Sequence, residues 1–215
     1  MLLALDTATS AVTAAVHDGA TVRAERSVLD HRRHTETLAP IIRDTLAAAG
    51  IAAADLSAIA VGVGPGPFTG LRVGIVTART MGLALGIPVH GVCSLDAIAA
   101  EVAAGEAASP AEFLVATDAR RKEVYWATYR DGRRTDGPHV GRAAELVEDV
   151  RALPCAGRGP ELYSDALPHA ITVRDVSAAA LADFAHTEIV AGRALLDTEP
   201  LYLRRPDAKP RPSGP

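Results

Sequence analysis

Apolar positions at the start of the chain predict three antiparallel β-strands. Leu2–Leu5 is continuously apolar and ends in the polar segment Asp6–Ser10, as expected for a buried strand followed by a turn. Val12–Val16 is a second apolar run, and the Asp18-Gly19 pair behind it is a strong hairpin signal. The segment Thr21–Val28 then returns as a third strand. The chain is therefore predicted to begin with a three-stranded meander.

After the meander, apolar residues recur at the spacing of an α-helix. The helix is predicted to start near Thr37, with Pro40 in its first turn, and to end at Gly50. Its apolar face is made of Leu38, Ile41, Ile42, Thr45, Leu46 and Ala49. This spacing places one stripe of the helix against a core.

Strands and helices then alternate. Leu56–Val63 and Val89–Cys93 are predicted strands, and the segment between them becomes a helix after the turn Gly64–Pro67. Thr69 is the expected N-cap of this helix, and Gly86 the residue just beyond its end. Strands joined by crossover helices after an antiparallel meander indicate an α/β protein with a mixed sheet.

The second half of the chain repeats the opening pattern. The small, polar segment Ala104–Pro110 is the best candidate for a domain boundary. After it, Phe113–Thr117 is a predicted strand that ends in Asp118, and Val124–Tyr129 is a predicted strand that runs back beside it. The same order of strand, aspartate, turn and strand occurs in Leu2–Val16. The other predicted elements are a helix Leu95–Ala103 capped by Ser94, a short helix Ala143–Val150, a short strand Leu153–Ala156 and a last helix Ser177–Gly192.

One ridge of the helix after the Gly/Pro turn has almost no side chains. The residues on it, four apart, are Gly70, Gly74, Ala78, Gly82 and Gly86. Each interior glycine costs a helix about 1 kcal/mol relative to alanine. Such a ridge makes sense only if something packs very close to it. The close neighbour is either the chain's own sheet or a helix of another subunit, and we expect mainly the latter.

Composition and charge narrow the range of possible functions. Only 4% of the residues are aromatic, so small aliphatic side chains are expected to build the core. The formal net charge of -4 argues against a protein that binds nucleic acid by itself, which usually needs a basic face. Cys93 and Cys155 match no metal spacing and are expected to be reduced thiols of a cytoplasmic protein. Neither a signal peptide nor a membrane-spanning segment is predicted.

Two turns are candidate sites for an anion. Asp6–Ser10 offers a carboxylate and three hydroxyls at a strand end, where a phosphate or hydrated Mg²⁺ could bind, or where the same groups could simply cap the strand. Gly62–Arg72 offers backbone amides at a helix N-terminus with an arginine nearby, or simply a tight turn. It is not a Walker A loop, since no Gly-Lys-Ser/Thr follows.

Other polar clusters carry no visible chemistry. His31 and His34 lie in a loop between arginines and predict a solvated basic loop, so no metal site is expected. The turn after Asp118 contains Arg120, Arg121 and Lys122 but no glycine that would let backbone approach a phosphate. The sequence contains no nucleophile elbow and no HExxH motif.

Five segments along the chain together resemble the TsaB (YeaZ) family. They are Leu3–Thr9, Arg33–Pro40, Gly62–Gly74, Asp118–Tyr125 and Pro200–Arg204. Members of this family are accessory subunits of the bacterial machinery that makes N6-threonylcarbamoyladenosine in tRNA. The resemblance covers nearly the whole chain, and the Pro-Gly-x-Phe-Thr-Gly-Leu-Arg run is specific.

The resemblance implies an actin/Hsp70/sugar-kinase-like (ASKHA) α/β fold made of two RNase H-like domains with mixed sheets. It also implies a homodimer in which one copy is replaced by the catalytic subunit TsaD through a helix bundle at the same surface. The ATPase TsaE is a further implied partner, and tRNA is met through the complex. No cofactor is expected to bind tightly to this chain, although ATP or ADP with Mg²⁺ fits the interface of the complex.

These expectations are specific enough to test. Residues 1–105 are predicted to form the partner-binding domain, residues 106–203 a smaller second domain and residues 204–215 a disordered basic tail. The predicted remnants of a phosphate or nucleotide site are Asp6, Thr7, Thr9, Gly66, Thr69, Gly70 and Arg72. The predicted partner interface is Leu38, Ile41, Ile42, Gly70, Leu71, Gly74, Ala78 and Gly82. The expected function is a non-catalytic scaffold, and the alternative is an ATP-dependent phosphotransferase that uses Asp6.

Overall fold

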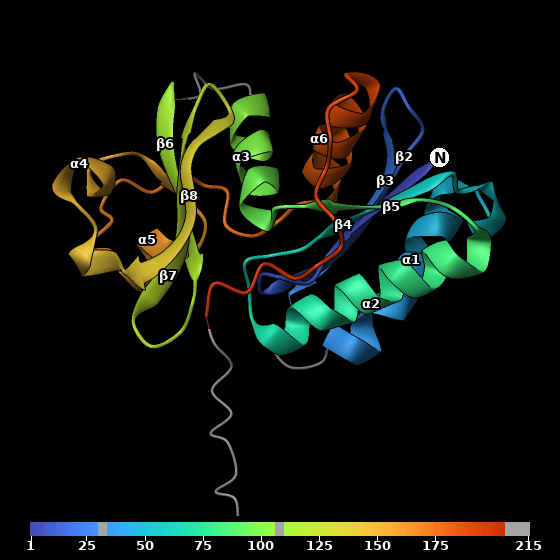
Figure 1. The fold of residues 1–215 in the computed structure, drawn as a ribbon, viewed down its shortest axis with the longest axis horizontal. Helices are drawn as coiled ribbons and strands as arrows, with labels where there is room; N and C mark the ends of the chain where they lie inside the picture. The colour runs from blue at the N-terminus through green and yellow to red at the C-terminus, as the bar shows by residue number, and fades with distance from the viewer. Residues whose placement is uncertain (30–33, 106–109, 205–215) are drawn as a thin grey trace, which may run out of the picture.

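A mixed five-stranded sheet forms the centre of the first half of the chain (Figure 1). The structure is a computed structural model that describes residues 1–29, 34–105 and 110–204. The strands of this sheet, in spatial order, are β3 (Val22–Leu29), β2 (Ala11–His17), β1 (Leu2–Asp6), β4 (Ala58–Gly62) and β5 (Val89–Val92). β1, β2 and β3 are antiparallel, whereas β4 and β5 run parallel to β1. The predicted meander and crossover strands are confirmed.

A second, four-stranded sheet repeats this topology. Its strands, in spatial order, are β8 (Arg133–Arg142), β7 (Glu123–Arg130), β6 (Glu112–Asp118) and β9 (Cys155–Ala156). β6, β7 and β8 form an antiparallel meander, and β9 runs parallel to β6 as β4 does to β1. Asp6 ends β1 and Asp118 ends β6, so the repeat seen in the sequence is a repeat in the fold. The predicted α/β class with two mixed sheets is confirmed.

Helices cover both faces of the first sheet. α1 (His34–Ala49) and α2 (Phe68–Leu85) pack on one face, and their apolar side chains close a core with β1, β2 and β4. α3 (Ser94–Ala104) and α6 (Ala178–Val190) form a second core with the other face and with side chains of the second sheet. The short α4 (Glu148–Arg151) and α5 (Gly159–Leu162) lie on the outer side of the second sheet (Figure 1). Two 3-10 turns complete the described elements, Ala53–Asp55 and Ala143–Glu145.

Four predicted boundaries are wrong. α1 begins at His34, so Pro40 lies in its second turn rather than its first. α2 begins at Phe68 with Pro67 as N-cap, and not at Thr69. Ser94 is the first residue of α3, and its hydroxyl bonds to another element instead of capping the helix. The predicted helix Ala143–Val150 is a 3-10 turn followed by α4.

Some predictions concern residues that the structure does not describe. His31, Glu106–Ser109 and the tail from Arg205 onwards lie outside the described residues, as does the side chain of His34. Within the described part of the chain, no helix combines the length and apolar character needed to cross a bilayer.

Candidate functional site

The turn between β1 and β2 is closed by its own contacts. Asp6 is fully buried, and its Oδ1 accepts a hydrogen bond from the Ala8 amide at 2.6 Å. Its Oδ2 accepts a hydrogen bond from the Ser94 hydroxyl at 2.6 Å, and Ser94 Oγ accepts one from the Gly64 amide. Burial raises the pKa of Asp6 from 3.8 to about 6, although the hydrogen bonds from Ser94 and the backbone act to lower it.

The two threonines of this turn are also engaged. The Thr7 hydroxyl donates to the Gly70 carbonyl at 2.7 Å and accepts a hydrogen bond from the Gly74 amide at 3.1 Å. Thr9 Oγ1 accepts a hydrogen bond from the Val176 amide at 3.3 Å. Asp6 and Thr7 are buried, and their polar groups already have partners within the chain. The predicted phosphate site on them stays a prediction that this geometry does not favour. These groups join β1 to α2 and α3.

The other predicted phosphate residues do not meet in one site. Gly66 is buried, and a Cβ there would lie 2.6 Å from the Ala8 carbonyl oxygen, so this glycine permits close backbone packing. Thr69 and Arg72 lie at the surface. The Arg72 guanidinium stacks 3.7 Å above the Phe68 ring, and its Nε donates to the Tyr202 hydroxyl. Arg72 therefore belongs to a surface cluster separate from Asp6.

The small-residue ridge of α2 packs against the chain's own sheet. A Cβ added at Gly70 would lie 2.6 Å from the Thr7 carbonyl oxygen, and one at Gly74 would lie 2.6 Å from Thr7 Oγ1. A Cβ at Gly82 would collide with the Val89 side chain on β5. The glycines thus allow α2 to approach β1 and β5 closely.

The predicted partner-interface residues are all buried within the single chain, although Ile42 also lines a groove between α1 and α2. Gly70, Gly74 and Gly82 are buried within the single chain. The predicted apolar side chains are at most 6% exposed: Leu38, Ile41, Ile42, Leu71 and Ala78. The helical period correctly indicated buried residues, but they are buried against the sheet of the same chain.

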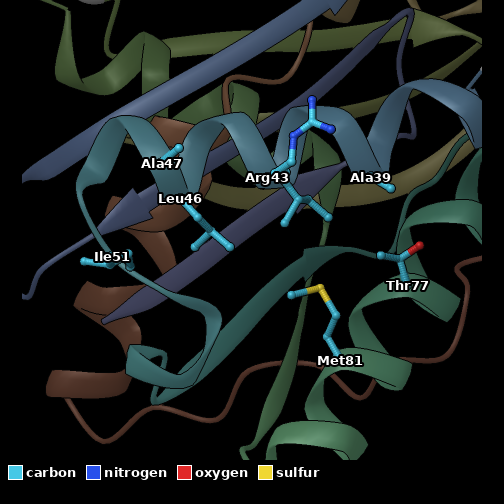
Figure 2. Close-up of a pocket in the computed structure, with 8 residues that line it drawn as sticks. Ala39, Arg43, Leu46, Ala47, Ile51, Thr77 and Met81 are labelled. Atoms are coloured by element: carbon cyan, nitrogen blue, oxygen red, sulfur yellow. The ribbon is translucent and has the colours of Figure 1, made fainter.

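An apolar groove lies between α1 and α2. Its lining comes from α1, from Ile51 behind it and from Thr77 and Met81 of α2. Figure 2 shows the side chains of Leu46 and Met81 pointing into the space between the two helices. The cavity measures about 550 Å³, and Arg43 is the one charged residue among the described residues that line it. On the exposed side of α2, Val76 and Leu83 are 59% and 87% exposed.

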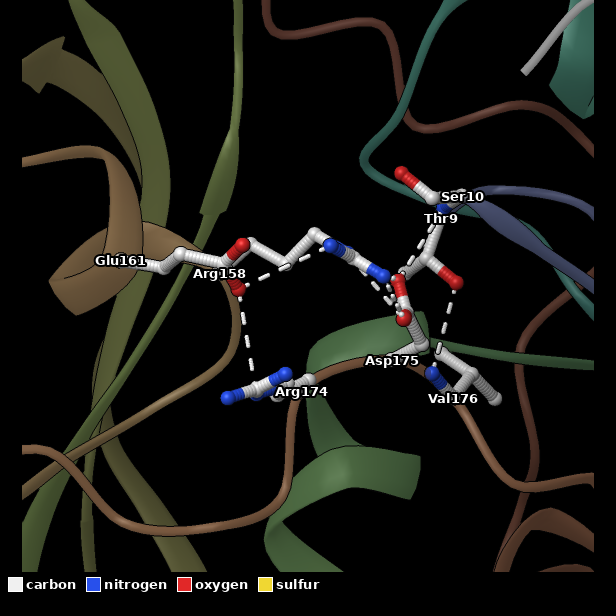
Figure 3. A network of polar contacts seen from close by, with 7 residues as sticks. All are labelled: Thr9, Ser10, Arg158, Glu161, Arg174, Asp175 and Val176. Carbon is white, nitrogen blue, oxygen red and sulfur yellow. Dashed lines mark hydrogen bonds and ion pairs between the residues drawn. The ribbon is translucent and has the colours of Figure 1, made fainter. Parts of the chain in front are cut away.

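A polar network ties the β1–β2 turn to the later part of the chain (Figure 3). Arg158 donates to both oxygens of Asp175, with Nη2 to Oδ2 at 2.7 Å. Asp175 Oδ1 also accepts a hydrogen bond from the Ser10 amide at 3.2 Å. Glu161 completes the network at 3.7 Å from Arg158. The Asp175 carboxylate thus accepts a hydrogen bond from a backbone amide of the turn, so that amide already has a partner within the chain.

We expect Arg158→Ala to loosen this junction without unfolding the cores. The Asp175 carboxylate, only 12% exposed, would lose its charged partner, at a cost of about 1–2 kcal/mol after allowing for partial solvent access. Hydrogen exchange should speed up at the Ser10 and Val176 amides and stay slow in β1. Arg174→Ala is the matched control, since Arg174 is 65% exposed and contacts Glu161 at 3.8 Å. Equal exchange rates in both variants would contradict a role for the Arg158–Asp175 ion pair in holding the turn.

Sequence reasoning missed the residues that close the turn. Ser94 follows β5, and the ends of parallel β1 and β5 lie at one edge of the sheet, so its proximity to Asp6 could have been inferred from topology. Arg158 lies between β9 and α5, and Asp175 in the irregular segment before α6, where no hydrophobic period indicates a position.

The remaining candidates for chemistry are buried or dispersed. Burial raises the thiol pKa of Cys93 and of Cys155 to about 12, which keeps both thiols protonated and unreactive. Among the described residues, no group of three or more His, Cys, Asp or Glu side chains converges as metal ligands would.

Comparisons with known proteins find relatives that match this chain over most of its length. The family model described as TsaD: tRNA N6-adenosine threonylcarbamoyltransferase matches residues 28–204. An uncharacterized protein of Mycobacterium tuberculosis is 48% identical over 97% of this chain and 94% of its own length. The tRNA threonylcarbamoyladenosine biosynthesis protein TsaB of Haemophilus influenzae is 30% identical over 94% of this chain and 93% of its own. The structure of YeaZ from Pseudomonas aeruginosa superposes with a TM-score of 0.80, with 30% identity, over 94% of this chain and 99% of that one.

Proposed function

The chain belongs to the TsaB (YeaZ) family of tRNA threonylcarbamoyladenosine biosynthesis proteins, and from this membership we propose that it is a non-catalytic scaffold subunit. In this proposal it binds and activates a TsaD-type catalytic subunit that modifies A37 of tRNA. Residues 1–105 form the partner-binding domain and residues 106–203 the smaller second domain, except that α6 packs on the first sheet. The protein acts in the cytoplasm.

The closed β1–β2 turn supports a non-catalytic role. A phosphotransferase of this fold would need Asp6 to face a phosphate or its Mg²⁺, whereas Asp6 is buried and bonded to Ser94 and Ala8. The Asp175 carboxylate on the Ser10 amide would also repel a phosphate there. We therefore favour the scaffold over the alternative ATP-dependent phosphotransferase.

The groove between α1 and α2 is the observation that carries the proposal. Large apolar grooves on soluble proteins commonly bind other proteins. A helix of a partner would place apolar side chains against Leu46 and Met81, and Val76 and Leu83 would extend the contact along α2. We propose that a second copy of the chain and the TsaD-type subunit compete for this face. ATP or ADP with Mg²⁺ and the TsaE-type ATPase would join at the complex rather than at this chain alone.

We expect Ala47→Glu to weaken association at this groove about tenfold or more, because a carboxylate would be buried against apolar side chains. Ala47 is exposed on α1 and lines the groove. Sedimentation velocity should show the loss both for the chain alone and with the TsaD-type subunit. Ala48→Glu is the matched control, since Ala48 is also exposed on α1 but does not line the groove.

Reconstitution tests the function itself. The chain is assayed for modified tRNA alone and with TsaD, TsaE and the enzyme that supplies threonylcarbamoyl-adenylate. Modification should require all components and fall in Ala47→Glu but not in Ala48→Glu. Modification by this chain alone, or full activity of Ala47→Glu, would overturn the scaffold proposal.

A further inference from the structure

We propose that the cavity between the first turn of α2 and the β6–β7 turn binds the sugar-phosphate backbone of single-stranded RNA. This inference rests on the proposed function, because it names a contact between this subunit and the RNA that the assembly modifies. It concerns a different part of the molecule from the groove between α1 and α2.

Three segments far apart in the sequence meet at this cavity. They are Gly66–Phe68 at the start of α2, Ala119–Arg121 with Tyr125 at the β6–β7 turn, and Tyr202–Arg204 at the end of the described chain. The last segment is fixed on one side by the Leu201 amide, which donates to the Val63 carbonyl, and on the other by the ion pair of Arg204 with Glu123. Figure 1 shows this segment running from the first sheet toward β7.

Arginine side chains gather at the cavity although the chain as a whole is acidic. Three arginines line it, Arg120, Arg121 and Arg204, and none of its described lining residues is acidic. Arg120 forms an ion pair with Asp118, with 3.2 Å between Arg120 Nη1 and Asp118 Oδ2. The Arg120 side chain is nevertheless 67% exposed. Arginine is suited to phosphate because its planar guanidinium offers paired donors.

The β6–β7 turn carries cationic residues at positions whose backbone conformation glycine adopts more easily. Arg120, Arg121 and Lys122 have φ values of +62°, +54° and +64°, all in the left-handed region that disfavours large side chains. The Arg120 amide donates to Asp118 Oδ1, the side chain that starts the turn, at 2.7 Å. A turn built only for geometry would use glycine or asparagine, so the cationic side chains themselves are the feature that the turn presents.

Aromatic rings border the cations. Phe68 and Tyr202 stack with their centroids 5.1 Å apart and are 41% and 40% exposed. Arg72 covers one face of Phe68 and bonds to the Tyr202 hydroxyl, which holds the pair rigid. Arg72 and Tyr202 already cover the Phe68 ring, so Tyr202 is the ring on which a base could stack. An exposed aromatic ring beside arginines suits single-stranded nucleic acids, since a base stacks on the ring and phosphates meet the cations.

The size of the cavity favours a polymer over a free nucleotide. Its volume is about 230 Å³. Sites that enclose a whole drug-sized ligand usually measure about 300–1,000 Å³, so a nucleoside triphosphate would not be enclosed here. In this inference one phosphate with its ribose occupies the cavity, and the rest of an RNA strand continues across the surface.

The test uses glycine substitutions that remove charge and strain together. In the full chain, Arg120→Gly with Arg121→Gly should leave the thermal midpoint unchanged or higher, because glycine prefers the left-handed backbone. Its affinity for a fluorescein-labelled single-stranded RNA should fall about tenfold or more in fluorescence anisotropy. Each phosphate contact should contribute about −0.7 to the slope of log K against log salt, so the slope should be shallower in the double variant than in the wild type.

Two controls complete the experiment. Arg130→Ala should bind RNA as the wild type does, because Arg130 pairs with Glu112 at the opposite end of β7. Arg120→Lys with Arg121→Lys should retain the salt dependence. Unchanged RNA affinity in the glycine variant, salt-independent binding, or displacement of the RNA by equimolar ATP would each overturn the inference. RNA binding that depends on these arginines while Ala47→Glu associates normally would overturn the docking proposal alone.

Discussion

Replacing Gly74 by alanine is expected to lower the free energy of unfolding by about 2 kcal/mol, although alanine favours a helix by about 1 kcal/mol over glycine. The added methyl group would lie 2.6 Å from Thr7 Oγ1. Thr7 would have to move, and its buried hydrogen bonds to the Gly70 carbonyl and the Gly74 amide would be lost or stretched. Packing against β1 therefore outweighs helix propensity, and the sign of the change tests the internal position of the ridge.

Thermal denaturation of the monomeric fraction measures this effect. For a chain of this size, 2 kcal/mol corresponds to a fall of about 4–8 °C in the midpoint. Thr80→Ala is the control on the same helix, since Thr80 is exposed and alanine there should be slightly stabilising. If Gly74→Ala instead melts like the wild type and only loses self-association, the ridge would be an intersubunit surface after all.

The helix ridge shows what spacing predicts and what it does not. Small residues every four positions correctly predicted a very close neighbour along α2. They could not identify that neighbour, because a glycine ridge accommodates a strand of the same chain as readily as a helix of another. The contacts that decide the question, with Thr7 and Val89, come from residues before and after the helix in the sequence.

Most strands were predicted from buried apolar runs, and β3 from the hairpin signal before it, whereas β8 was missed. β1 and β2 are buried along their whole length, so their apolar runs stand out. β8 lies at the edge of the second sheet, contains Gly137 and Pro138, and has no fully buried residue. An edge strand needs neither an apolar face nor every backbone donor, so its sequence resembles a loop.

The polar turn after β1 shows why the sequence alone left two interpretations of a site open. Its carboxylate and hydroxyls fitted either a ligand site or a cap on the strand. The composition of a turn does not reveal whether those partners are a ligand or the chain itself. Here Ser94, 88 residues away from Asp6, supplies the hydrogen bond that a ligand would otherwise provide.

Asp6 is expected to make the stability of the protein depend on pH. Its pKa in the folded chain is about 6 because of burial, against an ordinary value of 3.8, so the folded state binds this proton more tightly than the unfolded state. The contribution of Asp6 to stability is therefore fully present below about pH 4 and is lost as the pH rises through 6. The difference between the two pKa values corresponds to about 3 kcal/mol.

Asp6→Asn should remove this dependence, because the amide stays neutral at every pH. The useful quantity is the difference in unfolding free energy between wild type and variant, measured by urea denaturation from pH 4 to pH 7.5. Other buried acids whose pKa is raised, Asp96 and Glu101, cancel in that difference. Over this pH range, wild-type stability should fall by about 2.5 kcal/mol relative to the variant. Ser94→Ala should shift the fall to higher pH, since it removes a hydrogen bond that lowers the pKa of Asp6. A difference that does not change with pH would mean that solvent reaches Asp6 and that the turn is open.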